Sequence, residues 1–331
     1  MTSQPSVIVE RPETPLLWLD TSFLIALGRA EKDPERGDRR VLELVDVIDA
    51  KRKEDQLVCV ESDQAREVGG HPRASEIRLR LRKLTYNIQV RGRLELDRFQ
   101  VAEAMRAYLT DDDEIRLKRR VFFRDDPAAT VQEVSKQGWF ISVDTGMHPD
   151  LLGRAKQAKE RTHEDVEALR QKNRAAGTTY EQQLERERSG FLEGQRVILE
   201  RLRAQLLSPE PDYMLIAAGS PLRDYLRTWD DLGGDPDQAM PFFLSEHFLA
   251  LPCNDIPFRL YAQILTIDRP VEPGDAMDIQ HMAAALPIAT WVLTDKSLAN
   301  RVRQLGLDRA WGSTVYALKT VEALKIELEA L

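Results

Sequence analysis

Acidic residues close two apolar segments of this sequence. Asp20 directly follows the apolar run of residues 16–19, and Asp295 comes just after the run of residues 290–293. Each run is continuous rather than alternating, which is typical of strands covered on both faces of a parallel sheet. Because ligands of open α/β sheets bind outside the carboxyl ends of such strands, both acids are candidates for chemistry.

A third acid, Asp278, lies near the start of a predicted helix over residues 275–286. From Asp278 this helix descends by about 12 Å, at roughly 1.5 Å per residue, and the following strand climbs back by about 13 Å. The rise along the helix and the rise along the strand are therefore nearly equal and opposite in direction. We therefore expect Asp278 and Asp295 to meet at the sheet edge where Asp20 lies.

The second predicted strand, residues 57–60, supplies a fourth acid in one of two places. Glu67 lies in the early turns of the helix that follows, and Glu61 stands directly at the strand end. Carboxylates that crowd together repel each other unless a cation lies between them. Their oxygens suit Mg²⁺ or Mn²⁺, and such ions support phosphodiester hydrolysis without a nucleophile from the protein.

The elements that must position these acids come from the two ends of the chain. Apolar spacing predicts helices from about residue 21, around 39–51, and over 256–265 and 297–305, with a further helix at the end of the chain. Residues 1–70 and 253–331 therefore form one predicted unit, a mostly parallel sheet with helices. Residues 71–252 are a mostly helical insertion, with one short strand predicted at 139–143.

Within the insertion, residues 151–207 predict a long helical hairpin, broken at Gly177 and capped again by Thr178 and Glu181. Its charges are nearly balanced, so it offers little to a phosphate backbone. Docking of a protein partner, self-association or a lid over the site are the roles that this composition favours.

Bulk composition narrows the class of protein. The chain has 331 residues and a formal net charge of -8 at pH 7, so any nucleic-acid site has to be local. Cys59 and Cys253 form no CxxC pair, which argues against a disulfide scaffold and a structural zinc site. Since the N-terminus is polar and no apolar run approaches about 18 residues, we expect a cytoplasmic protein without a membrane partner.

Taken together, these residues resemble the four-acid pattern of PIN domain nucleases. The resemblance rests on D-T-S at 20–22, A-R-E-V at 65–68, the D-x-x-x-x-x-x-A helix start at Asp278 and V-L-T-D ending at Asp295. It implies an α/β three-layer sandwich with a mostly parallel central sheet. It also implies cleavage of single-stranded RNA, more rarely DNA, leaving a 5′ phosphate. Family members place far fewer residues between the second and third acids.

Carried over to this sequence, the resemblance assigns the metal ligands and their neighbours. The predicted catalytic and metal-binding acids are Asp20, Glu67, Asp278 and Asp295. The residues expected close around them are Ser22, Asp275 and Thr294. His281, one turn after Asp278, is left out of the metal set because a lone histidine on a helix more often packs or supports a ligand. The alternative for Glu67, Asp275 and Asp278 is purely structural: acids near a helix start stabilise the helix by interacting with its dipole.

A basic segment follows the second strand. Residues 73–93 contain seven Lys and Arg and one acid, a balance of 7 minus 1, or +6. The predicted phosphate contacts are Arg73, Arg78, Arg80, Arg82 and Lys83. The alternative is an amphipathic helix that buries Ile77, Leu81 and Leu84 and leaves its arginines in solvent.

Two other functions compete with a nuclease. A catalytically silent scaffold would keep the fold and act as an RNA-binding or protein-interaction module through its helical insertion. Intact acids count against it, because a binding scaffold does not need all four. A phosphotransferase of the haloacid dehalogenase type would need a second carboxylate two residues after Asp20, where this chain has Ser22.

Overall fold

The computed structural model describes residues 5–33, 35–62, 64, 68, 71, 73–137, 149–209 and 221–331. Its strands are all parallel and form one sheet of four strands and one of two. The expected mixed α/β class with a parallel sheet is therefore confirmed. None of the helices in these ranges is both long enough and apolar enough to cross a membrane.

The larger sheet has the order β3-β2-β5-β6. Its strands are β2 (Leu16–Leu19), β3 (Val58–Val60), β5 (Trp291–Thr294) and β6 (Thr314–Ala317). Trp18 pairs with Val60, and Leu19 pairs with Leu293. The strands predicted at 16–19, 57–60 and 290–293 are thus confirmed to within one residue. Because all four strands are parallel, their carboxyl ends lie at one edge.

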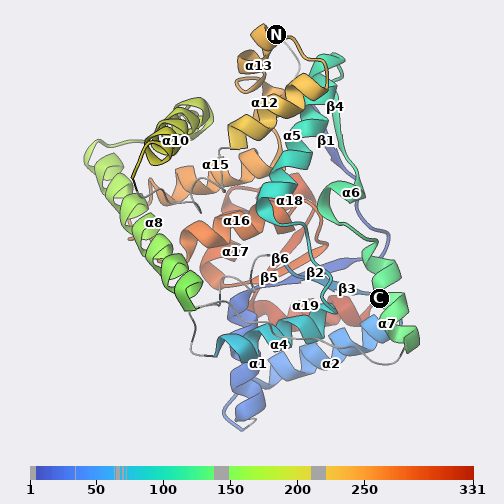
Figure 1. Ribbon diagram of the computed structural model, residues 1–331. Helices are drawn as coiled ribbons and strands as arrows, with labels where there is room; N and C mark the ends of the chain where they lie inside the picture. Colours follow the sequence, from blue (N-terminus) through green and yellow to red (C-terminus); the bar gives the residue numbers. More distant parts are fainter. Residues whose placement is uncertain are drawn as a thin grey trace.

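Helices pack on both faces of this sheet (Figure 1). One face is covered by α1 (Thr21–Lys32), α2 (Arg39–Lys53), α4 (Ala74–Thr85) and α19 (Val321–Glu329). The other is covered by α5 (Arg93–Leu109), α15 (Pro252–Ile264), α16 (Asp275–Ala285) and α17 (Lys296–Gln304). Leu17 and Leu19 point into the first core, and Leu16 and Trp18 into the second. This alternation explains why the strand sequence is apolar throughout.

The smaller sheet pairs β1 (Ser6–Val9) with β4 (Glu114–Leu117). Further helices of the described chain are α6 (Arg119–Phe122), α7 (Pro127–Gln137), α12 (Pro221–Asp231), α13 (Pro236–Phe242), α14 (Glu246–Leu249) and α18 (Leu307–Trp311). Their buried side chains share one continuous hydrophobic cluster with β2, β3 and β5. The predicted boundaries at 71 and 252 therefore do not mark a break in the core.

The segment predicted as a hairpin forms α8 (Pro149–Ala175), α9 (Tyr180–Ser189) and α10 (Phe191–Leu206), which Figure 1 shows at one side of the molecule. The predicted break at Gly177 is confirmed, since its φ of 63° is left-handed. The capping box is one residue later than expected, with Thr179 and Gln182. The strand predicted at 139–143 lies outside the described residues.

Phe242 tests whether the insertion and the sheet share a core. Its fully buried ring lies 5.2 Å from the ring of Phe243 and 5.7 Å from that of Phe248. We expect Phe242→Ala to lower the free energy of unfolding by about 3–5 kcal/mol while urea denaturation keeps a single transition. Leu244→Ala, at a side chain 56% exposed, is the matched control and should change it by less than about 0.5 kcal/mol. Separate unfolding of two units would contradict the shared core.

Candidate functional site

Asp20 lies at the carboxyl end of β2 and is 5% exposed. Its Oδ1 accepts a hydrogen bond from the Thr21 backbone N–H at 2.7 Å, which caps the N-terminus of α1. Its Oδ2 accepts hydrogen bonds from the hydroxyls of Ser22 at 2.6 Å and Thr294 at 3.4 Å. The two hydroxyl residues expected beside the site therefore do contact this acid.

Asp295 occupies the equivalent place at the end of the neighbouring strand. Its Oδ1 accepts hydrogen bonds from the backbone N–H groups of Ser297 at 2.6 Å and Leu298 at 3.2 Å, so it caps α17. Among the described residues, nothing donates a hydrogen bond to its Oδ2. The Asp20 N–H donates to the Leu293 carbonyl at 2.9 Å, which ties the two strand ends together.

Asp278 is placed by the helix that crosses above these strands. One turn after it, His281 is buried, its ring 5.9 Å from that of Trp18 and its Nδ1 3.1 Å from Ser62 Oγ. Only residues 286–290 separate α16 from β5, so the helix runs back against the strand direction. Its first turn, with Asp278, therefore lies toward the carboxyl edge. His281 packs against β2 and the end of β3, in line with its exclusion from the metal set.

Asp275 has a structural partner as well as a place near the site. Its buried carboxylate accepts a hydrogen bond from the equally buried Arg301 at 2.8 Å, joining α16 to α17. Its other oxygen accepts from the Glu272 N–H at 2.9 Å. Burial raises the pKa of Asp275, and the negative charge of Asp295 acts in the same direction. The side chain thus lies close enough to Asp295 to sense its charge but is held by an arginine.

The fourth acid is the least defined. Glu61 is fully buried and accepts a hydrogen bond from Gln89 Nε2. Burial raises the pKa of Glu61, while Gln89 and the positive charge of Arg82 on α4 lower it. Cys59, two residues earlier, points into the core on the α4 side, so Glu61 is directed away from the face of Trp18. Glu67 lies outside the described residues.

The described part of the chain therefore assembles the site only in part. Two predicted ligands end the adjoining central strands, and a third lies on the helix above them. Within the ranges that the structure describes, no three His, Cys, Asp or Glu side chains are grouped so that they could hold a metal ion. The residue types at this edge are nevertheless hard oxygen donors, the kind that Mg²⁺ and Mn²⁺ prefer.

Residues 74–85 of the basic segment form α4, in which the expected apolar face is buried but Arg78 is buried as well rather than in solvent; phosphate contacts by its arginines stay a prediction. Ile77, Leu81 and Leu84 are buried, as in an ordinary amphipathic helix. Arg80 is paired with Glu31 at 2.6 Å, which reduces its value for phosphate binding. A hollow of about 320 Å³ lies between α1 and α4. The basic residues that line it are Arg29, His71, Arg73 and Arg80.

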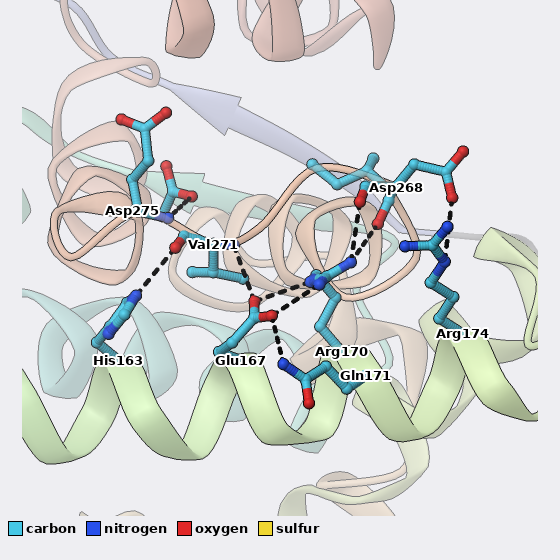
Figure 2. A network of polar contacts seen from close by, with 10 residues as sticks. His163, Glu167, Arg170, Gln171, Arg174, Asp268, Val271 and Asp275 are labelled. Carbon is cyan, nitrogen blue, oxygen red and sulfur yellow. Dashed lines mark hydrogen bonds and ion pairs between the residues drawn. The ribbon is translucent and has the colours of Figure 1, made fainter.

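Side chains of α8 form hydrogen bonds with the loop that leads into α16 (Figure 2). Arg170 of α8 is 4% exposed, and its Nη1 donates to the carbonyls of Ile267 at 3.1 Å and Asp268 at 3.2 Å. Glu167 accepts two hydrogen bonds from Arg170, at 2.7 and 2.8 Å, and one from the Val271 N–H at 2.9 Å. This network holds residues 267–271, which lie just before the start of α16. No local sequence pattern predicts this hydrogen-bond network.

Comparisons with known proteins add nothing to this geometry. No family model, no curated protein and no solved structure matches the chain. The roles of its residues therefore rest on their positions and chemistry.

Arg170 should be far more important than its neighbour Arg174, whose side chain is 62% exposed beside Asp268. Arg170→Met removes the side-chain donor of two loop carbonyls and two of the hydrogen bonds to the Glu167 carboxylate, and we expect a loss of about 3 kcal/mol of unfolding free energy. Arg174→Met should cost less than about 1 kcal/mol. Hydrogen exchange at residues 265–274 should accelerate in the first variant alone, and equal exchange in both would contradict the anchor.

The same network predicts a dependence on pH. Hydrogen bonds from Arg170, and then from the Val271 N–H, hold the pKa of Glu167 well below its usual value. A lowered folded-state pKa means that the contribution to stability is complete above the unfolded value, about 4.3, and is lost as the pH falls below it. The stability difference between the wild type and Glu167→Gln should therefore be constant from pH 6 to 8 and shrink below about pH 4. A difference that grows in acid would contradict this assignment.

Proposed function

We propose that this protein is a metal-dependent nuclease with a PIN-like fold that hydrolyses phosphodiester bonds of single-stranded nucleic acid, with RNA preferred over DNA. One observation carries the proposal. Asp20 and Asp295 end the two adjoining central strands of a parallel sheet, and the Thr294 hydroxyl donates to Asp20. Ligands of such sheets bind at this edge.

The arrangement of elements supports the finer fold assignment. Helices lie on both faces of the sheet, as a three-layer sandwich requires. Glu61 forms an isolated parallel bridge with Gln89, so the chain around residue 89 extends the strand order beyond β3. Both acid-bearing strands, β2 and β5, are interior to the four-stranded sheet.

A divalent cation such as Mg²⁺ or Mn²⁺ fits the residue types at this edge. We assign Asp20, Glu67, Asp278 and Asp295 as the groups that would hold it. When bound, the ion supplies an activated water and stabilises negative charge on the phosphate. The Asp295 Oδ2, which accepts no hydrogen bond from the described residues, supports this assignment.

The surrounding residues act by orientation. Ser22, Thr294 and the Thr21 N–H fix both oxygens of Asp20, and the first turn of α17 fixes one oxygen of Asp295. The pair of Asp275 with Arg301 holds α16 against α17, and so sets the place of Asp278. Such supporting contacts commonly change activity by about 10–100-fold when they are removed.

The competing function is a catalytically silent scaffold that binds RNA or a protein through its helical region. It is favoured by one observation, namely that the described residues hold no group of three ligands ready for a metal. The two proposals differ in what happens to a bound RNA.

A cleavage assay separates them. Purified protein is incubated with labelled single-stranded RNA and DNA, with Mn²⁺ or with EDTA. We expect cleavage that requires Mn²⁺, prefers RNA and falls by about 100-fold or more in Asp20→Asn. Asp46→Asn, on the exposed side of α2, is the matched control and should cleave like the wild type.

Cleavage that survives both EDTA and Asp20→Asn would overturn the proposed mechanism. Binding of RNA without cleavage under any of these conditions would support the scaffold instead.

A further inference from the structure

A cleft of about 600 Å³ opens beside β3, at the same edge of the sheet as the candidate site. The Glu61 N–H donates to the Ile88 carbonyl at 3.0 Å, and the Val90 N–H donates to the Glu61 carbonyl at 2.8 Å. Residues 88–90 therefore run parallel to β3 as one more short extended segment. Residues 91–93, which follow it, come out at the carboxyl edge and form one wall of the cleft.

Ser62 connects this cleft with the candidate site. It lines the cleft, and its hydroxyl contacts both His281 Nδ1 at 3.1 Å and Trp18 Nε1 at 3.3 Å. Trp18 lies two residues before Asp20 in β2, and His281 lies one turn after Asp278 in α16. A polymer that crosses the acidic edge can thus continue into the cleft.

The charges of the lining favour an anion. Arg91, Arg93 and Arg124 face Glu95 and Asp125, which leaves a formal charge of 3 minus 2, or +1. Arg91 and Arg124 share the carboxylate of Glu95, one guanidinium on each oxygen. Arg93 is ion-paired with Asp97 at 3.6 Å, outside the lining, but its side chain is 54% exposed and that of Arg124 is 73% exposed, so both guanidinium groups can also reach a phosphate.

The rest of the lining suits a nucleobase. Ile88, Val90 and Phe123 form an apolar floor, and each is less than 9% exposed. Asn87 and Gln89 are exposed lining residues, and the Asn87 amide can donate and accept hydrogen bonds, while Gln89, whose Nε2 donates to Glu61, offers its Oε1 as an acceptor. Small-molecule sites commonly combine an apolar floor with a few polar groups in a volume of about 300–1,000 Å³. The arginines suit a phosphate, the apolar floor suits the face of a base, and the amides suit its polar edge, so the lining as a whole matches a nucleotide.

We propose that this cleft binds one nucleotide of the single-stranded substrate, next to the phosphodiester bond that is cleaved. The proposal rests on the proposed function, since it names a substrate contact for the same edge of the sheet. The cleft holds the base on its apolar floor, and Arg93 and Arg124 contact the phosphate. Recognition is through apolar contact and charge, so it extends to nucleotides of different sequence.

Gly92 allows a direct test. A Cβ at this position meets no atom within 4 Å, and its φ of −57° suits any residue. Because Gly92 lines the cleft, the ring in Gly92→Phe would occupy the space proposed for the base. Gly194→Phe is the matched control, since a Cβ on Gly194 of α10 also meets no atom within 4 Å and lies away from the cleft.

The probe is a fluorescein-labelled single-stranded RNA hexamer of mixed sequence, titrated with full-length protein in EDTA and followed by fluorescence anisotropy. We expect Gly92→Phe to weaken binding by about 10-fold or more and Gly194→Phe to leave it unchanged. Arg124→Gln should weaken binding by about 3-fold and reduce its salt dependence. Thermal melting verifies the folding of each variant, and Arg124→Gln keeps the proposal testable where Gly92→Phe fails to fold.

Wild-type affinity in both Gly92→Phe and Arg124→Gln would overturn the proposal. The cleavage assay on the wild-type protein separates it from the proposed function. If Gly92→Phe abolishes RNA binding and the wild-type protein cleaves no substrate, the nucleotide site in the cleft is supported and the proposed nuclease activity is excluded. If the wild-type protein cleaves RNA but both variants bind RNA with wild-type affinity, the nuclease activity is supported and the nucleotide site in the cleft is excluded.

Discussion

The parallel pairing of β2 with β5 is the constraint on which the rest of the structure depends. Leu19 and Leu293 lie in register although 273 residues separate them along the chain. This pairing brings the two strand-ending acids, Asp20 and Asp295, to neighbouring positions. It also requires crossover connections on the faces of the sheet, because parallel strands cannot be joined by a tight turn. The helical layers that bury both faces therefore follow from the same pairing that builds the candidate site.

The sequence predicts this sheet well where burial is two-sided. The run of residues 16–19 is apolar on both faces, and the strand is found there. The sequence does not predict β6, because its first residue, Thr314, is polar and exposed and breaks the apolar run that marks burial on both faces. β1 and β4 are equally short, and each depends on a partner more than 100 residues away. Strands of this kind become recognisable only when the partner is known.

The candidate site also has features that the sequence predicts and features that it does not. The strand-ending positions of Asp20 and Asp295 could be predicted because they depend on local order, whereas the hydroxyls of Ser22 and Thr294 near Asp20 could be expected only from the resemblance to a family pattern. The burial of Glu61 under Gln89 could not, because it depends on which side α4 packs. The guanidinium of Arg301 on Asp275 could not either, because a helix sequence does not reveal its buried partner. What escaped prediction is consistently the long-range pairing of polar groups.

The continuous core has a consequence for how the chain can be divided. Residues 1–70 and 253–331 carry the predicted acids, yet the side chains of α5, β4 and α13 complete the hydrophobic layer on one side of their sheet. Splicing the two ends together would expose to water the part of this layer that α5, β4 and α13 now cover. A fragment made of the two ends alone would therefore expose apolar surface and tend to aggregate, because the intervening helices are part of the layer that covers this sheet.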